Sequence, residues 1–147
     1  MPVYTVEHHP LNKQGKASGT LVGGNLSLIT SIAGSKFNFL DRRDDIILFI
    51  EDIDENLEHL NRMTYQLIAS GVIDRVKAII LGDFGGYRPT ADFDTVEQMF
   101  DSIFQNYNIP ICYKFPCGHT FRNFPMIEGA KVTLTITGES TTLQFDI

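Results

Sequence analysis

The sequence predicts an α/β fold, a small mixed β/α domain with a parallel strand–helix–strand unit and a C-terminal antiparallel hairpin. Two strands of the buried type, 46–50 and 76–81, flank a segment whose apolar residues recur every three or four positions, as in an amphipathic helix. Two strands joined by such a helix run parallel, through a right-handed crossover. Near the C-terminus, residues 131–137 and 141–147 alternate strictly between apolar and polar side chains, and the turn 138–140 joins them into a hairpin.

The N-terminal third predicts short elements. Residues 3–6 and 19–22 are expected to form brief strands. Asn25 is a suitable N-cap for a short helix over 26–33, which Gly34 ends. These elements lead into the parallel unit.

The middle of the chain continues the alternation of helices and strands. Asp54 is expected to cap the central helix, which runs for roughly 16 residues and ends at Gly71. Asp94 or Thr95 begins the next helix, and residues 109–113 form a third strand with proline near its start. The whole chain, 1–147, is therefore expected to form a single domain.

Composition excludes some classes of function. The chain has 147 residues, 43% of them hydrophobic, and a formal net charge of −6. An acidic chain with scattered basic residues argues against a nucleic-acid partner. No apolar run approaches the roughly 18 residues that span a membrane, so no membrane partner is expected.

Two further features bear on localisation. The N-terminus has neither the basic nor the apolar region of a signal peptide. Cys112 and Cys117 imply no disulfide framework, so free thiols in a reducing compartment are expected. Together these features favour a cytoplasmic location.

Polar side chains follow several of the predicted strands. Glu51 and Asp52 end the strand 46–50, a glycine-rich loop (82–89) follows the next strand, and His119 lies in a loop after the third. Ligands of open α/β sheets bind beyond the carboxyl ends of the strands, so these groups are expected to converge on one crevice. A carboxylate and a histidine together suit a general base. Equally, the two acids can simply end a strand.

No nucleophile for such a base is apparent. No serine lies in a Gly-x-Ser-x-Gly elbow. Cys117 with His119 as its base is an alternative, although two residues on one turn form a poor geometry for proton transfer. The histidines and acids lack zinc-binding spacing, and the glycine-rich loop lacks the order of a phosphate-binding loop, so neither a metal nor another cofactor is expected. The segment 23–25 could present backbone amides to an anion, but a plain turn with an N-cap explains it as well.

Taken in order, these landmarks resemble the C-terminal half of the LD-carboxypeptidases, the serine peptidase family that also includes the microcin-immunity peptidases. The resemblance covers roughly residues 8–147, and the spacing of 68 residues between Glu51 and His119 fits the family. Five segments carry it: LVGGNL (21–26), ILFIED (47–52), NRM (61–63), AIILGDF (78–84) and FPCGH (115–119).

The resemblance implies a Ser-His-Glu triad, in which Glu51 orients His119 and His119 acts as general base. It further implies that Gly24, Asn25 and Arg62 bind the substrate. In this family the domain is a small mixed β/α unit, sometimes described as a swivelling β/β/α domain. The nucleophilic serine and the oxyanion hole belong to a flavodoxin-like N-terminal domain, which has no counterpart within residues 1–147.

The implied substrate of the full-length protein is the bond between an L- and a D-amino acid in a murein stem peptide, such as the terminal D-alanine of a tetrapeptide. That reaction belongs to cytoplasmic cell-wall recycling. The chain alone is expected to be inactive, its partner being the N-terminal domain, and a homodimer stays open. The alternative is a non-catalytic ligand-binding or regulatory α/β module.

A missing partner domain also predicts an exposed apolar contact face. The candidates lie near the rim of the expected crevice. They are Leu21, Phe84, Tyr87, Phe121 and Phe124.

Overall fold

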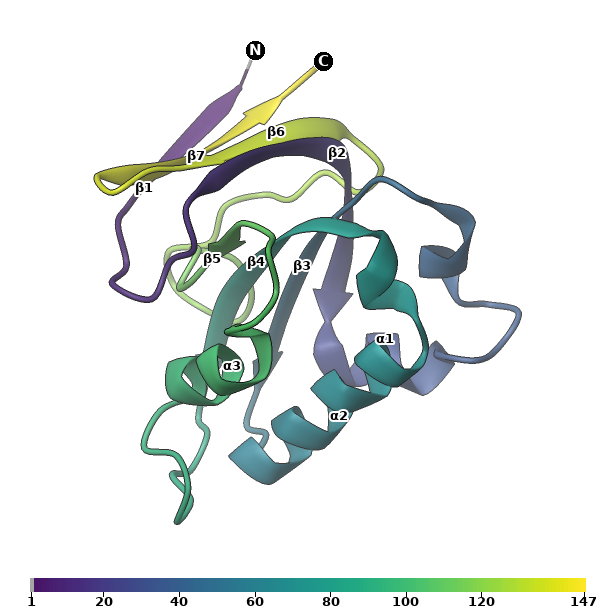
Figure 1. The fold of residues 1–147 in the computed structure, drawn as a ribbon, viewed down its shortest axis with the longest axis vertical. Coiled ribbons are helices and arrows are strands. Elements are labelled where there is room, and N and C mark those ends of the chain that lie inside the picture. The colour runs from purple at the N-terminus through teal and green to yellow at the C-terminus, as the bar shows by residue number, and fades with distance from the viewer. Residues whose placement is uncertain (1) are drawn as a thin grey trace.

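The computed structural model describes residues 2–147, in which one mixed sheet of seven strands is accompanied by three α-helices (Figure 1). Two short 3-10 helices, Phe39–Arg42 and Val72–Arg75, lie before β3 and β4. In chain order the other elements are β1 (Val3–Glu7), β2 (Gly15–Asn25), α1 (Leu26–Ile32), β3 (Ile46–Ile53), α2 (Leu57–Ala69), β4 (Val76–Gly85), α3 (Val96–Phe104), β5 (Ile111–Cys112), β6 (Lys131–Ile136) and β7 (Ser140–Phe145).

The sheet has a parallel and an antiparallel part. Its strand order is β1-β7-β6-β2-β3-β4-β5, in which β2, β3, β4 and β5 are parallel to one another. The hairpin β6–β7 pairs antiparallel with β2 through β6 and with β1 through β7. The predicted fold class, with its parallel strand–helix–strand unit and C-terminal hairpin, is confirmed.

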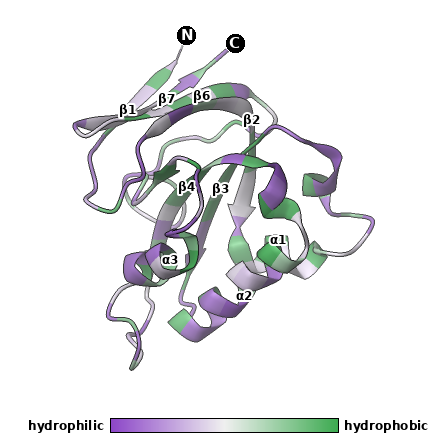
Figure 2. Ribbon diagram, viewed as in Figure 1, coloured by the Kyte–Doolittle hydropathy of each residue, from purple (hydrophilic) through white to green (hydrophobic). Residues whose placement is uncertain are grey.

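Strand β3 is buried on both faces, as its unbroken apolar run predicts. Ile46, Leu48 and Ile50 belong to the core cluster beneath the three helices. Ile47 and Phe49 point the other way, into a second cluster that the antiparallel strands enclose. Figure 2 shows the hydrophobic residues concentrated on the central strands, with hydrophilic residues on much of α2.

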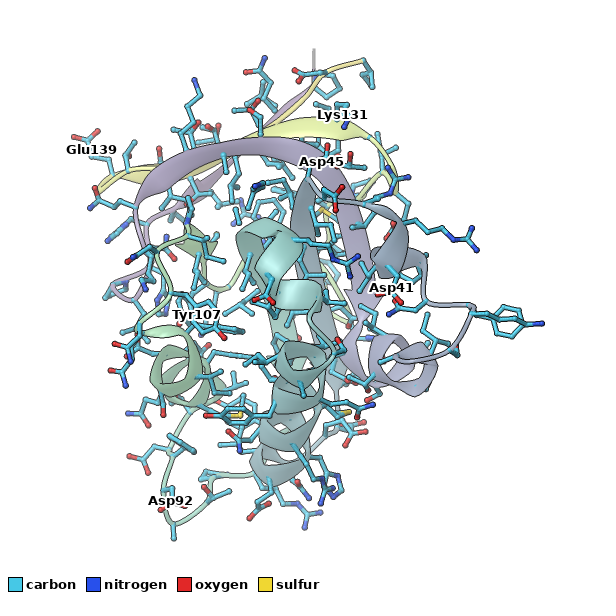
Figure 3. All side chains as sticks on the ribbon, turned by 45° about the vertical axis from the view of Figure 1, so that its right-hand side comes forward. Asp41, Asp45, Asp92, Tyr107, Lys131 and Glu139 are labelled. Atoms are coloured by element: carbon cyan, nitrogen blue, oxygen red, sulfur yellow. The ribbon has the colours of Figure 1, made fainter. Side chains whose placement is uncertain are left out.

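Strand β2 connects the two parts of the sheet. Its first half pairs with β6 and its second half with β3, and it bends from the antiparallel layer down into the parallel one (Figure 1). At this bend, Lys131 of β6 contacts Asp45, labelled together in Figure 3, and donates to Thr20 Oγ1 at 2.8 Å. The hydrogen bond from Lys131 lowers the pKa of the Asp45 carboxyl. Because β2 pairs with β6 over residues 15–20 and with β3 over residues 20–25, it is far longer than the strand predicted at 19–22.

The helix caps confirm most of the predicted boundaries. The Asn25 side chain accepts from Leu28 N at 3.1 Å and caps α1. Thr95 caps α3 in a capping box with Gln98, and Gly71 after α2 has a φ of 84°.

The predicted cap of α2 is wrong. Asn56, not Asp54, accepts from His59 N at 2.9 Å, and α2 has 13 residues. Strand β3 continues to Ile53 and delays the helix, so that Asp54 lies in the turn with a φ of 58° and donates its N–H to Gly85 O at 2.9 Å. Strand β5 is also shorter than the predicted segment 109–113.

Candidate active site

Glu51 and His119 meet at the carboxyl end of β3. Their Oε2 and Nδ1 atoms are 2.8 Å apart, although the residues are 68 positions apart in the chain. The Glu51 side chain is 10% exposed, whereas the His119 side chain is 54% exposed. The structure thus joins a buried carboxylate to an imidazole that faces solvent.

A β-bulge in β4 makes room for Glu51. Ile50 pairs with Leu81 and Asp52 pairs with Phe84, so Glu51 stands opposite two residues of β4, Gly82 and Asp83. The Asp83 N–H donates to Cys117 O at 2.8 Å. The bulge is therefore also the point where the loop that carries His119 attaches to the sheet.

Two glycines form the walls around the Glu51 side chain. A Cβ on Gly118 would lie 2.8 Å from Glu51 Cβ and 2.9 Å from its Oε2, and Gly118 has a φ of +115°. A Cβ on Gly82 would lie 2.6 Å from Cys117 O and 3.2 Å from Glu51 Cβ. Only residues without a Cβ allow the strand, the loop and the carboxylate to approach this closely.

The loop after β5 is held by hydrogen bonds on both sides of His119. Phe115 N donates to Leu81 O at 2.9 Å, Phe124 N donates to Pro116 O at 2.7 Å, and Gly118 N donates to Asn123 Oδ1 at 3.1 Å. The side chain of Phe115 is buried in the second core cluster. The imidazole therefore projects from a fixed backbone.

The protonation of His119 follows from its partner. An ionised carboxylate only accepts hydrogen bonds, so the Nδ1–H of His119 donates to Glu51. This hydrogen bond and the charge of Glu51 raise the pKa of His119, and the charges of Asp52 and Asp54 add to the effect. Nε2 is left as the atom that can accept a proton from a reacting group.

Comparison with known proteins places this chain in a family. The family model described as the LD-carboxypeptidase C-terminal domain matches residues 18–134. The chain belongs to the LD-carboxypeptidase family. The resemblance carried by the five sequence segments is thereby confirmed.

Curated relatives of this LD-carboxypeptidase domain include carboxypeptidases and an immunity protein. A probable murein peptide carboxypeptidase of Bacillus subtilis is 37% identical over 142 residues, which cover 94% of this chain and 44% of the relative. The microcin C7 self-immunity protein MccF of Escherichia coli is 30% identical over 120 residues, which cover 82% of this chain and 35% of that protein. The domain therefore spans less than half the length of these relatives.

Solved structures agree on the fold. The crystal structure of muramoyltetrapeptide carboxypeptidase from Oxalobacter formigenes superposes with a TM-score of 0.82 at 26% identity, over 99% of this chain and 50% of that one. The structure of MccF in complex with glutamyl sulfamoyl guanosine has a TM-score of 0.79 at 26% identity, over 95% of this chain and 40% of that one.

The predicted substrate-binding residues are only partly brought together. Gly24 pairs with Ile50 and Asn25 with Glu51, so both end β2 beside the end of β3. Arg62 of α2 instead lines a pocket of about 460 Å³, whose wall also includes Tyr65, Asp92 and Phe93 but neither Glu51 nor His119. The substrate-binding role of the three residues stays a prediction.

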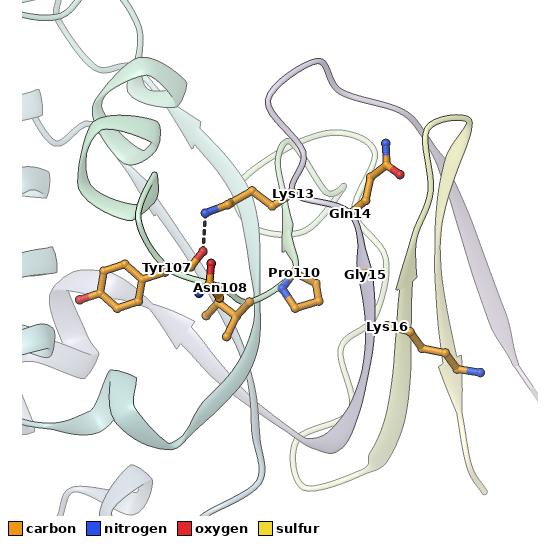
Figure 4. Close-up of a pocket in the computed structure, with 8 residues that line it drawn as sticks. Lys13, Gln14, Gly15, Lys16, Tyr107, Asn108 and Pro110 are labelled. Atoms are coloured by element: carbon orange, nitrogen blue, oxygen red, sulfur yellow. Dashed lines mark hydrogen bonds between the residues drawn. The ribbon is translucent and has the colours of Figure 1, made fainter.

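Another pocket, of about 570 Å³, is lined by neither Glu51 nor His119 (Figure 4). It lies between the start of β2 and the segment after α3. Lys13 on its wall donates from Nζ to the carbonyl oxygens of Phe104 and Gln105, at 3.0 Å each, and contacts Tyr107 O. This lysine donates to carbonyls at the C-terminal end of α3, of which Phe104 O also accepts from Tyr107 N at 3.0 Å, and this is a structural role.

The structure argues against Cys117 as a nucleophile. Both cysteines are free and buried. Burial raises the pKa of Cys117 to about 12, and the charge of Glu51 acts in the same direction. The thiol is therefore protonated at neutral pH, whereas the thiolate is the reactive form.

Within residues 2–147, no group of three or more histidine, cysteine or acidic side chains stands in a metal-binding arrangement. No helix in that range is long and apolar enough to cross a membrane.

The predicted apolar contact face is largely wrong. Leu21 and Phe84 are buried in the core, and Tyr87 packs partly buried against it. The ring centroids of Phe124 and Tyr4 are 4.7 Å apart, and Phe124 packs partly buried against the second core cluster. Phe121 alone of the five is fully exposed, at 108% of the reference area.

Sequence reasoning missed the residues that shape the site. The sequence predicts Gly82 and Gly118 as loop residues and indicates no role for Asn123. A signal for the glycines was present, since each is adjacent to a strand end or to the candidate histidine. Their close approach to Glu51 is a tertiary feature that the sequence does not reveal.

Proposed function

We propose that this domain supplies the histidine and glutamate of a Ser-His-Glu triad in a serine-type LD-carboxypeptidase. The observation that carries the proposal is the 2.8 Å contact between the buried Glu51 carboxylate and the exposed His119 imidazole. A triad needs a base whose far nitrogen is accessible and whose near nitrogen is held by an acid. His119 meets both conditions.

In the proposed mechanism, Nε2 of His119 removes the proton from a serine hydroxyl as the oxygen attacks the scissile carbonyl. Glu51 holds the Nδ1–H and stabilises the imidazolium that forms. His119 then returns the proton to the leaving amine, which departs as a D-amino acid. A water molecule, activated by the same base, releases the acyl group from the serine.

The serine comes from an N-terminal domain of the same protein. This chain spans 44% of its Bacillus subtilis relative, which leaves room for such a domain in a full-length protein. The exposure of His119 suits a nucleophile delivered from outside the domain, and fully exposed Phe121, two residues later, offers an apolar contact for the partner. The domain alone therefore lacks peptidase activity.

The substrate is a murein tetrapeptide, from which D-alanine is released during cytoplasmic peptidoglycan recycling. The relatives' names support this choice, since they include a murein peptide and a muramoyltetrapeptide carboxypeptidase. Gly24 and Asn25 contact the peptide from the end of β2. Arg62 contacts it through the α2 pocket if the peptide extends that far.

A second candidate is a non-catalytic ligand-binding or regulatory module. The observation that favours it is the pocket of about 460 Å³ around Arg62, which stands apart from the Glu51–His119 pair. A ligand could occupy that pocket without any chemistry at His119.

The test supplies the missing nucleophile. The chain alone, and the chain fused to the N-terminal portion of the Bacillus subtilis relative, are incubated with murein tetrapeptide, and mass spectrometry follows the loss of D-alanine. We expect release by the fusion only, with the N-terminal portion alone as the control. Turnover by the chain alone would overturn the assignment of the nucleophile to a partner domain. A folded but inactive fusion that binds peptide would favour the non-catalytic module.

A further inference from the structure

Asp52, the residue after Glu51, is a buried carboxylate with an unusually full set of donors. Its side chain lies on the α1 side of the sheet, opposite Glu51, and the residue is 3% exposed. Oδ1 accepts from Asn25 Nδ2 at 3.0 Å and from Ile53 N at 2.9 Å. Oδ2 accepts from Ser27 N at 2.9 Å and from Ser27 Oγ at 2.6 Å.

These donors compensate the burial of a charge. A carboxylate removed from water is strongly unfavourable unless cations or hydrogen bonds replace the lost solvation. Among residues 2–147, no lysine, arginine or histidine forms an ion pair with Asp52. Two backbone amides, a hydroxyl and a side-chain amide donate hydrogen bonds to the carboxylate instead. Such charge-assisted hydrogen bonds are strong and directional.

Three of the four donors come from the end of β2 and the first turn of α1, and the fourth, Ile53 N, is the next residue of β3. Asp52 therefore ties the end of β3 to the β2–α1 junction immediately after Glu51. On the other side of Glu51, the bulge of β4 and the Cβ-free Gly82 and Gly118 enclose the side chain. The backbone of Glu51 is fixed from the α1 side, and its side chain from the His119 side.

We propose that Asp52 is a positioning residue for the Glu51–His119 pair. By anchoring the end of β3, it holds the Glu51 carboxylate where Oε2 meets Nδ1 of His119. The catalytic meaning of this inference rests on the proposed function, but the geometric effect does not. Asp52 acts through Glu51 and touches neither His119 nor the reacting atoms.

The test distinguishes the positioning role of Asp52 from the effect of its negative charge on His119. D52N and D54N each remove one negative charge near His119, but Asp54 is exposed and has none of the contacts to Asn25 and Ser27. In D52N one of the two accepting oxygens is replaced by an amide nitrogen that cannot accept a hydrogen bond, so buried donors lose their partner. The readouts are the NMR signal of the His119 Nδ1 proton and the titration of the ring, both measured on the intact chain.

We expect exchange of the Nδ1 proton with solvent to accelerate about tenfold in D52N, the effect of losing one charge-assisted hydrogen bond, and to change little in D54N. The His119 titration midpoint should fall in both variants, because each loses a charge that raises the pKa of His119. In an E51Q background the excess effect of D52N on Nδ1 proton exchange should vanish, because it acts through Glu51. Equal exchange rates in D52N and D54N, or an excess that persists in E51Q, would overturn the proposal.

A milder variant guards against loss of folding. S27A removes one donor to Asp52 and leaves every charge in place. It should accelerate Nδ1 proton exchange in the same direction by a smaller factor, and an unchanged rate in folded S27A would contradict the proposal. These readouts need no peptidase activity, so failure of the triad assignment and failure of the positioning role are distinguishable. In an active fusion, S27A should lower kcat with little change in KM.

Discussion

Residues 2–147 contain two histidine–glutamate contacts, which share the same atoms but differ in burial and in their separation along the chain. His59 Nδ1 lies 3.1 Å from Glu55 Oε2, one helical turn away, with the side chains 48% and 30% exposed. His119 Nδ1 lies 2.8 Å from Glu51 Oε2 across 68 residues, and its glutamate is only 10% exposed. Both use the same atoms of the same residue types.

The difference shows which surroundings indicate function. An i,i+4 pair forms wherever a helix places two compatible side chains on one face, and it contributes only about 0.2–0.5 kcal/mol. The pair of Glu51 and His119 is surrounded by a bulge in β4, by two glycines at which a Cβ would clash with Glu51 or with Cys117, and by a loop anchored to the sheet. A histidine–glutamate contact alone gives weak support for a catalytic role. The structure that surrounds Glu51 and His119 supports the proposed role more strongly.

The two contacts should differ most in how substitution of their histidines changes peptidase activity. In a fusion with an active N-terminal domain, H119N should lower kcat/KM by about 10²- to 10⁴-fold, because it removes a positioned general base. H59N should stay within about threefold of the wild type, as expected for an exposed residue of a helix surface. Release of D-alanine measures both. Similar losses in the two variants would mean that the contacts do not differ in function.

A smaller effect is expected on the free energy of unfolding when Gly118, which packs against Glu51, is replaced by alanine. G118A introduces a Cβ at a φ of +115° and within 3 Å of Glu51, whereas G34A introduces one at a φ of +81° with nothing within 4 Å. Backbone strain should cost each variant about 1–2 kcal/mol. Overpacking should cost G118A about 1–3 kcal/mol more.

Urea denaturation measures the two free energies of unfolding. G34A also serves as the control for the His119 signal, which it should leave unchanged while G118A displaces it. Equal destabilisation of the two variants, with the His119 signal intact in G118A, would show that Glu51 has more room than the structure indicates.

The sequence predicted the parallel unit because Ile46–Ile50 and Val76–Leu81 carry unbroken apolar runs around an amphipathic helix. It also predicted that Glu51 and His119 would meet, since both follow strands whose carboxyl ends share one edge of the sheet. That contact is present, while its catalytic role stays a prediction.

The misses have physical causes. The cap of α2 depends on where β3 ends, and β3 continues because Asp52 pairs with Phe84 beyond the bulge. The burial of Phe124 depends on the curl of the sheet, which brings β1 and its Tyr4 over the loop. Both features arise from contacts between distant segments, which local patterns do not contain.

The raised pKa of His119 has a defined consequence for pH dependence. A base acts in its neutral form, so activity of the fusion should rise with pH through a midpoint above the ordinary value for histidine. Folding also raises this pKa, so the contact stabilises the fold below the unfolded-state pKa, and this contribution is lost as pH rises through the folded-state pKa.

NMR titration of His119 in wild type and E51Q tests the central claim most directly, namely that Glu51 holds and polarises this imidazole. The hydrogen bond from Nδ1 to the Glu51 carboxylate is the largest cause of the raised pKa of His119. The titration midpoint of His119 in the wild type should therefore lie above the ordinary value for histidine. In E51Q the amide keeps the shape but not the charge, and the midpoint should fall. An unchanged midpoint in a folded E51Q chain would contradict the account.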